Sequence, residues 1–335
     1  MMRCCSRDEG GGIMSSQSMS LGRSWSPPWK RAPSVPAYPT LPQDYNLKVI
    51  QLINEQIKKL TIATGTAPLV LPRSLVVDRS EMVQVFSSIT ENLNGISGRP
   101  TKHRYIINQL GKLIGKAMSR NVLGLYVPSW QSPRHAGLFV VRSVIEEKAH
   151  QLGVTPQLLG ELVVNHEATH LWQFTAHPWL NAHFRSQLAS VIKMSENARV
   201  PGADTEEMAV KVRQSVQRMQ AEMSLIEGYA DFMAARFASP RIQQLAAVLD
   251  DRREHPGQGS FLQEVIKRLF GMEGKLAQYH AGNAFCTAVF AAGGDRLLNR
   301  VWEGPAALPT PEEMAKPSLW IQRMGLPPAV LPRAS

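Results

Sequence analysis

The sequence has 335 residues, 44% of them hydrophobic, which is enough to bury a large core as one large domain or two small ones. No apolar run approaches the roughly 18 residues that span a bilayer, and residues 1–20 lack the apolar segment of a secretory signal, so we expect a cytoplasmic protein without a transmembrane segment. The net charge is +10, but Lys and Arg are spread along the chain, so we expect a solvated basic surface and no specific nucleic-acid partner.

The N-terminal segment, residues 1–41, is rich in Ser, Gly, Pro and Arg. Such a composition cannot build a core, so we expect a disordered tail. From Asp44 onward, apolar residues recur at helical spacing and predict a helix, with the stripe Leu47, Ile50, Ile53, Ile57 and Leu60. A second amphipathic stretch covers residues 80–93, and residues 101–120 indicate another helix.

Two short apolar runs, residues 121–127 and 137–143, flank the turn-rich sequence PSWQSPRHA and predict a pair of strands. This pair is the one β element that the pattern indicates. The chain is therefore predicted to be mainly α with a small β element. We expect one domain over residues 42–328 and a flexible C-terminus at residues 329–335.

The next helix has a strong start signal, because Thr155 can cap free amide groups and Pro156 is tolerated at the first helical position. Its pattern runs through Phe174. A second long helical pattern covers residues 204–238 and is read as one helix or two. Further helical segments are predicted at residues 241–253, 258–280 and 282–302, followed by a Pro-rich tail.

The sequence HEATH, residues 166–170, matches the HExxH pattern. Because His166 and His170 lie one turn apart on one helix face, both imidazoles can reach one tetrahedral zinc ion. Glu167 is rotated by about 100° from His166, so it stays out of the ligand set but can act as a general base on a metal-activated water. In the competing interpretation both histidines are ordinary surface or core residues.

A third ligand must come from another segment, and hydrolases with this motif often take it from a Glu on a later helix. The sequence LIEGYAD offers Glu227, with Asp231 four residues on and on the same face, where it can accept the free ring N–H of a ligand histidine. Gly228 costs a helix about 1 kcal/mol, which suggests a close approach to its backbone. Tyr229 lies about 200° around the helix from Glu227, so it is not assigned to the metal face.

Other candidate residues are weaker. Four acids are interpreted as helix-start or surface charges, namely Asp204, Glu206, Glu207 and Glu222. His177 is interpreted as a capping or packing residue, with a place at the mouth of the site as the alternative, and His255 and His280 as structural. Lys275, Tyr279 or His280 is a candidate donor to an oxyanion.

Several separated segments resemble a bacterial zincin-like metallopeptidase family, sometimes labelled as associated with deazaflavin-cofactor biosynthesis. They are NHEATHLWQFTAHPWL, MSLIEGYAD, KLAQYHAGNAF and VWEGPAALPTPEEMAKPSLWIQR. The resemblance covers about residues 45–325 and implies a mostly helical zincin-like fold. It also implies His166, His170 and Glu227 as ligands of one zinc ion and Glu167 as the catalytic acid and base. At Tyr229 the chain departs from the His that the family's EGHAD pattern leads us to expect.

The resulting hypothesis is a zinc-dependent hydrolase, in which Glu167 takes a proton from a metal-activated water and delivers it to the leaving amine. The substrate is a peptide or a small amide. Two alternatives remain: a zinc hydrolase of a non-peptide amide or ester, and a non-catalytic protein in which zinc staples helices together.

Overall fold

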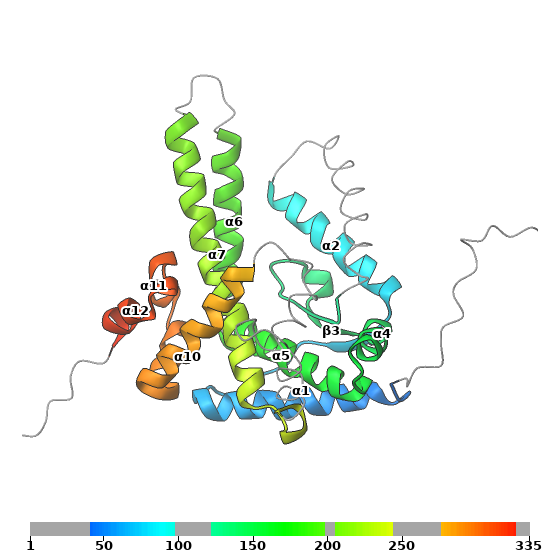
Figure 1. The fold of residues 1–335 in the computed structure, drawn as a ribbon. Coiled ribbons are helices and arrows are strands. Elements are labelled where there is room, and N and C mark those ends of the chain that lie inside the picture. Colours follow the sequence, from blue (N-terminus) through cyan, green and yellow to red (C-terminus); the bar gives the residue numbers. More distant parts are fainter. Residues whose placement is uncertain (1–40, 98–121, 198–204, 244–275, 326–335) are drawn as a thin grey trace, which may run out of the picture. The chain divides into compact units, whose positions relative to one another are not determined.

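The structure is a computed structural model, and it describes residues 41–97, 122–197, 205–243 and 276–325. The expected N-terminal tail, the predicted helix at 101–120, and most of the segments predicted at 241–253 and 258–280 lie outside these residues. The described part is mainly helical with one small sheet, which confirms the predicted fold class (Figure 1).

The first two predicted helices are present as α1 (Tyr45–Thr64) and α2 (Arg79–Ser97). Helix α1 ends at Gly65, which adopts the left-handed conformation (φ 66°) that glycine tolerates best. Its inner face is buried, but Leu47 and Ile50 from the predicted apolar stripe are exposed.

The sheet consists of β1 (Ser74–Val77), β2 (Gly124–Val127) and β3 (Gly137–Val141), in the order β1-β3-β2. The predicted pair is confirmed, since β2 and β3 are antiparallel and joined through η2 (Pro133–His135). Strand β1 was not predicted and pairs with β3 in parallel. Every residue of β3 is buried, which is expected of a central strand that is covered on both faces.

Helix α4 (Arg142–Leu152) leads from β3 to α5 (Pro156–Ala176), which begins where the sequence predicts. The Thr155 hydroxyl accepts a hydrogen bond from the Leu158 N–H and caps the helix. Helix α5 packs against α1, α7, β2 and β3. It is therefore buried nearly all round, polar residues included, and this is the setting of the HExxH sequence.

Two long helices, α6 (Trp179–Asn197) and α7 (Thr205–Arg236), lie side by side (Figure 1). The pattern at 204–238 is thus a single helix, and α6 was not predicted. Helix α7 also packs closely against α10 (Leu276–Leu298), which joins two predicted segments and kinks at Gly293 and Gly294.

The segment predicted to be a Pro-rich tail is folded as far as residue 325. It forms η4 (Pro305–Ala307), α11 (Pro311–Ala315) and α12 (Pro317–Met324), while η3 (Asn299–Trp302) is the end of the segment predicted to be helical at 282–302. Proline stands at the first helical position of η4, α11 and α12, where its missing N–H costs nothing. The fully buried Trp320 donates its indole N–H to the Ala307 carbonyl. No described helix has the length and apolar character needed to cross a membrane.

Candidate metal centre

The two histidines of the HExxH sequence project from one face of α5. His166 and His170 are 2% and 6% exposed, and their rings meet edge to face, with centroids 4.6 Å apart. The two Nε2 atoms lie 3.0 Å apart. The i, i+4 spacing therefore brings two imidazole nitrogens to a single buried point, as expected from the periodicity of the helix.

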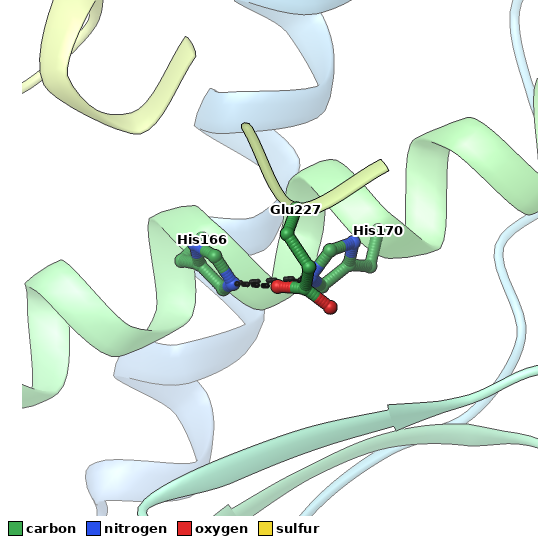
Figure 2. A group of neighbouring side chains, drawn as sticks. All are labelled: His166, His170 and Glu227. Carbon is green, nitrogen blue, oxygen red and sulfur yellow. Dashed lines mark hydrogen bonds and ion pairs between the residues drawn. The ribbon is translucent and has the colours of Figure 1, made fainter. Parts of the chain in front are cut away.

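Helix α7 supplies a carboxylate to the same point. The Oε2 atom of Glu227 lies 3.4 Å from His166 Nε2 and 3.3 Å from His170 Nε2. Figure 2 shows the three side chains pointing toward one another, with both rings from α5. Their ligand atoms all lie within 4.8 Å of one another, which would allow them to hold one metal ion. The structure thus brings the three sequence-predicted ligands together.

Each ring has a partner at its other nitrogen. His166 Nδ1 lies 3.0 Å from Asp231 Oδ1, a charge pair without hydrogen-bond geometry, and His170 Nδ1 is hydrogen-bonded to Gln173 Oε1 at 2.9 Å. Both partner atoms are acceptors, so each Nδ1 carries the ring proton in the neutral tautomer. Each Nε2 then presents a lone pair toward the other ring and toward Glu227.

The donor set fits a cation. Two imidazole lone pairs and a carboxylate oxygen face one another at 3.0–3.4 Å, a repulsive arrangement unless positive charge lies between them. Glu227 Oε2 is buried and has no hydrogen-bond donor among the described residues. Two nitrogens and one oxygen are also a typical zinc ligand set.

The electrostatics of these side chains also favour positive charge at this point. Burial would raise the pKa of Glu227, but His170 and His166 hold it well below its usual range. Burial would likewise lower the pKa of His166, but Asp231 and Glu227 raise it. The carboxylates therefore draw protons onto the histidines, and a bound metal ion would replace those protons.

Glu167 lies beside this cluster and is 1% exposed. Its Oε2 atom accepts a hydrogen bond of 2.7 Å from the Tyr126 N–H of β2, while Oε1 has no hydrogen-bond partner among the described residues. Burial raises the pKa of Glu167, against the influence of His166. A Cβ atom on Gly124 would meet Glu167 Cγ at 2.8 Å, so this glycine lets β2 approach the helix.

The backbone of Gly228 is closely approached, as predicted. A Cβ atom there would lie 2.1 Å from the Gly282 carbonyl carbon of α10. Tyr229 points away from the metal face, also as predicted. Its ring stacks on Trp172 with centroids 5.8 Å apart, and its hydroxyl donates to Asn299 Oδ1.

His177 is a packing residue. Its ring stacks on Trp302 and meets Trp172 edge to face, and its backbone N–H caps the end of α5. Burial lowers its pKa to about 4.

The interpretation of Glu222 as a surface or helix-start charge is wrong. Glu222 is fully buried between α6 and α7, where its carboxylate pairs with His183 and Arg218. Glu206 and Glu207 do lie in the first turn of α7, as predicted. The remaining candidates fall outside the described side chains, namely Asp204, His255, Lys275, Tyr279 and His280.

Gln173 was not singled out from the sequence, although it is fully buried and contacts His170. The helical spacing could have indicated Gln173, because position i+3 from His170 lies on the same helix face. Its second partner, the carbonyl of Ile226, lies 53 residues along the chain and gives no local signal.

Comparison with known proteins agrees with this geometry. The model of the family described as zincin-like metallopeptidase matches residues 81–321, well over half of the chain. A similar solved structure is described as a "putative hydrolase with a novel fold from Chloroflexus aurantiacus", with 29% identity and a TM-score of 0.61 over 84% of this chain and 90% of that chain. No curated protein matches. The resemblance found in the sequence is therefore confirmed, and the chain belongs to the zincin-like metallopeptidase family.

Proposed function

We propose that this protein is a zinc-dependent hydrolase that holds one zinc ion through His166, His170 and Glu227. The observation that carries the proposal is the convergence of three lone-pair-bearing atoms on one buried point, all within 4.8 Å of one another. Two imidazoles and one carboxylate form the ligand set of several catalytic zinc sites. Mg²⁺ and Ca²⁺ are disfavoured, because they prefer oxygen ligands.

The number of ligands favours catalysis over a structural staple. Within the described part of the chain, three His, Cys, Asp or Glu side chains form the cluster, and a structural zinc site takes four. A zinc ion held by these three side chains would have room for water or substrate. Bound zinc would supply Lewis-acid chemistry, polarising a carbonyl and making water a better nucleophile.

The proposed role of Glu167 is that of general base and then general acid. Its Oε2 atom is held by the Tyr126 N–H, which leaves Oε1 to take a proton from the attacking water and pass it to the leaving group. Burial raises the pKa of Glu167 above its usual value. This direction suits a group that must both accept and release a proton near pH 7.

A peptide is the proposed substrate class. Strand β2 lies at one edge of the described sheet, and the Tyr126 N–H points away from β3, since it bonds to Glu167. In an antiparallel strand the C=O of a residue points to the same side as its N–H. The site therefore lies beside the edge of β2 that does not pair with β3, and an extended peptide backbone could pair with the remaining groups of this edge. A non-peptide amide or ester hydrolase would use the same catalytic residues without this pairing.

Metal analysis tests the zinc site. Wild-type protein should contain one zinc ion for each chain, and His166→Ala and Glu227→Ala should lose it. Glu222→Gln is the matched control, because Glu222 is a buried glutamate of the same helix that pairs with His183 instead. Zinc retained in Glu227→Ala, or lost equally in Glu222→Gln, would contradict the assignment.

Activity tests the catalytic role. Glu167→Gln should retain zinc and abolish turnover in an unbiased peptide library, because the amide is nearly isosteric but cannot accept the proton. Full activity in this variant would exclude Glu167 as the base. Turnover of small amides or esters with no cleaved peptide would favour the non-peptide alternative.

A further inference from the structure

Gln173 joins the two helices that supply the metal ligands. Its side chain is fully buried, and its Oε1 atom lies 2.9 Å from His170 Nδ1 on α5. Its Nε2 atom donates a 3.0 Å hydrogen bond to the carbonyl of Ile226 on α7. Ile226 immediately precedes Glu227, so one side chain contacts both the second histidine and the backbone beside the carboxylate.

The partners of this amide fix its orientation. A backbone carbonyl can only accept, so the NH₂ group of Gln173 must face Ile226. The amide oxygen then faces His170 Nδ1, which must carry the ring proton. The lone pair of His170 Nε2 is thereby directed to the point shared with His166 and Glu227.

The neutral charge of Gln173 is also informative. The cluster already contains three buried carboxylates, those of Glu167, Glu227 and Asp231. Asp231 backs His166 with a negative charge, whereas His170 is backed by an uncharged amide. A carboxylate at position 173 would add a fourth negative charge and would turn an acceptor toward the Ile226 carbonyl, which is unfavourable in a buried site.

We infer that Gln173 is a positioning residue of the metal centre, which sets the tautomer of His170 and fixes its placement relative to Glu227. This inference rests on the proposed zinc site but not on any particular substrate. In this proposal Gln173 orients the ring of His170, as Asp231 orients the ring of His166. Gln173 also connects α5 to α7.

The test compares Gln173→Met with Gln56→Met, since Met has a similar volume and makes no comparable hydrogen bond. Gln56 is a matched control, because it is also buried and donates to Thr169 of α5, beside His170. Zinc affinity is measured by chelator competition, and we expect Gln173→Met to weaken it by about 10- to 100-fold. Gln56→Met should leave zinc affinity unchanged, although both variants should destabilise the metal-free protein.

A spectroscopic measurement follows the tautomer directly. In the cobalt-substituted wild type, proton NMR should show shifted exchangeable ring N–H signals for both ligand histidines. In Gln173→Met the His170 signal should be lost to solvent exchange while the His166 signal remains. Gln173→Glu keeps an acceptor for His170 Nδ1 but loses the donor to the Ile226 carbonyl, so it should retain the His170 signal while destabilising the metal-free protein.

The outcomes separate the two proposals. Unchanged zinc affinity in Gln173→Met, an equal loss in Gln56→Met, or an unaltered His170 signal would overturn the role of Gln173 and leave the zinc site standing. Wild-type protein that binds neither zinc nor cobalt would overturn the proposed function itself.

Discussion

Replacing Gly228 with Ala tests how tightly α7 and α10 pack together beside Glu227. Intrinsic helix propensity favours the change, because Ala stabilises a helix interior by about 1 kcal/mol relative to Gly. The structure predicts the opposite sign. The new Cβ atom would lie 2.1 Å from the carbonyl carbon of Gly282 and 2.4 Å from the nitrogen of Asn283, and neither backbone atom can rotate away.

The size of the effect follows from these distances. An ordinary contact between heavy atoms is about 3.5 Å, so relieving the 2.1 Å contact requires a shift of roughly 1.4 Å between α7 and α10. Overpacking of this kind costs about 1–3 kcal/mol, and a clash with backbone belongs at the upper end of that range. After the gain in propensity, we expect a net destabilisation of about 1–2 kcal/mol. Because Glu227 is the preceding residue, zinc affinity should fall as well.

Urea unfolding of the metal-free protein measures the first effect, and chelator competition measures the second. Gln214 provides the reference, since it lies exposed on α7 and the difference between Gln214→Ala and Gln214→Gly reports propensity alone. If Gly228→Ala stabilised the protein as much as that reference pair indicates, the close approach of α10 would have no energetic consequence. The packing argument would then be refuted.

Two further substitutions probe other parts of the site. Gly124→Ala would place a Cβ atom 2.8 Å from Glu167 Cγ. We expect this variant to retain zinc and to lose turnover by about 100-fold, because Glu167 would be displaced. Unchanged turnover would show that the contact does not position Glu167. Burial lowers the pKa of His177 to about 4. Between about pH 6.5 and pH 4, His177 therefore binds a proton in the unfolded chain but not in the folded protein. The free energy of unfolding then falls by up to about 1.4 kcal/mol for each unit of decreasing pH in this window. His177→Phe keeps an aromatic ring against Trp302 and should remove this slope in urea unfolding across that window, whereas an equal slope in both proteins would exclude His177 as its source.

The parts of the site that were predictable are those with a local signal. Thr155 and Pro156 mark the start of α5 because capping depends on adjacent residues alone. The meeting of His166 with His170, and the alignment of Glu227 with Asp231, follow from the helix repeat. That the two helices would face each other was not contained in either pattern; it was inferred from other HExxH hydrolases, which often take a third ligand from a later helix, and from the family resemblance.

The features that were missed depend on contacts between distant segments. Strand β1 is four residues long and is defined by its pairing with β3, more than sixty residues later. The burial of Glu222 depends on His183, which lies on the unpredicted helix α6. A lone glutamate in an amphipathic pattern looks like a surface charge, and only its partner reveals that it can be buried.

The sequence EGYAD meets two structural requirements within one short stretch of α7. Glu227 and Asp231 must face α5, where they contact His166 from two directions. Gly228 must lack a side chain because α10 crosses there. Tyr229 lies on the far side and packs among core aromatic rings, so a change of residue at this position alters the core rather than the ligand set. The departure from the expected His at position 229 is therefore compatible with the proposed metal site, because the candidate ligand atoms and the close helix crossing do not depend on that side chain.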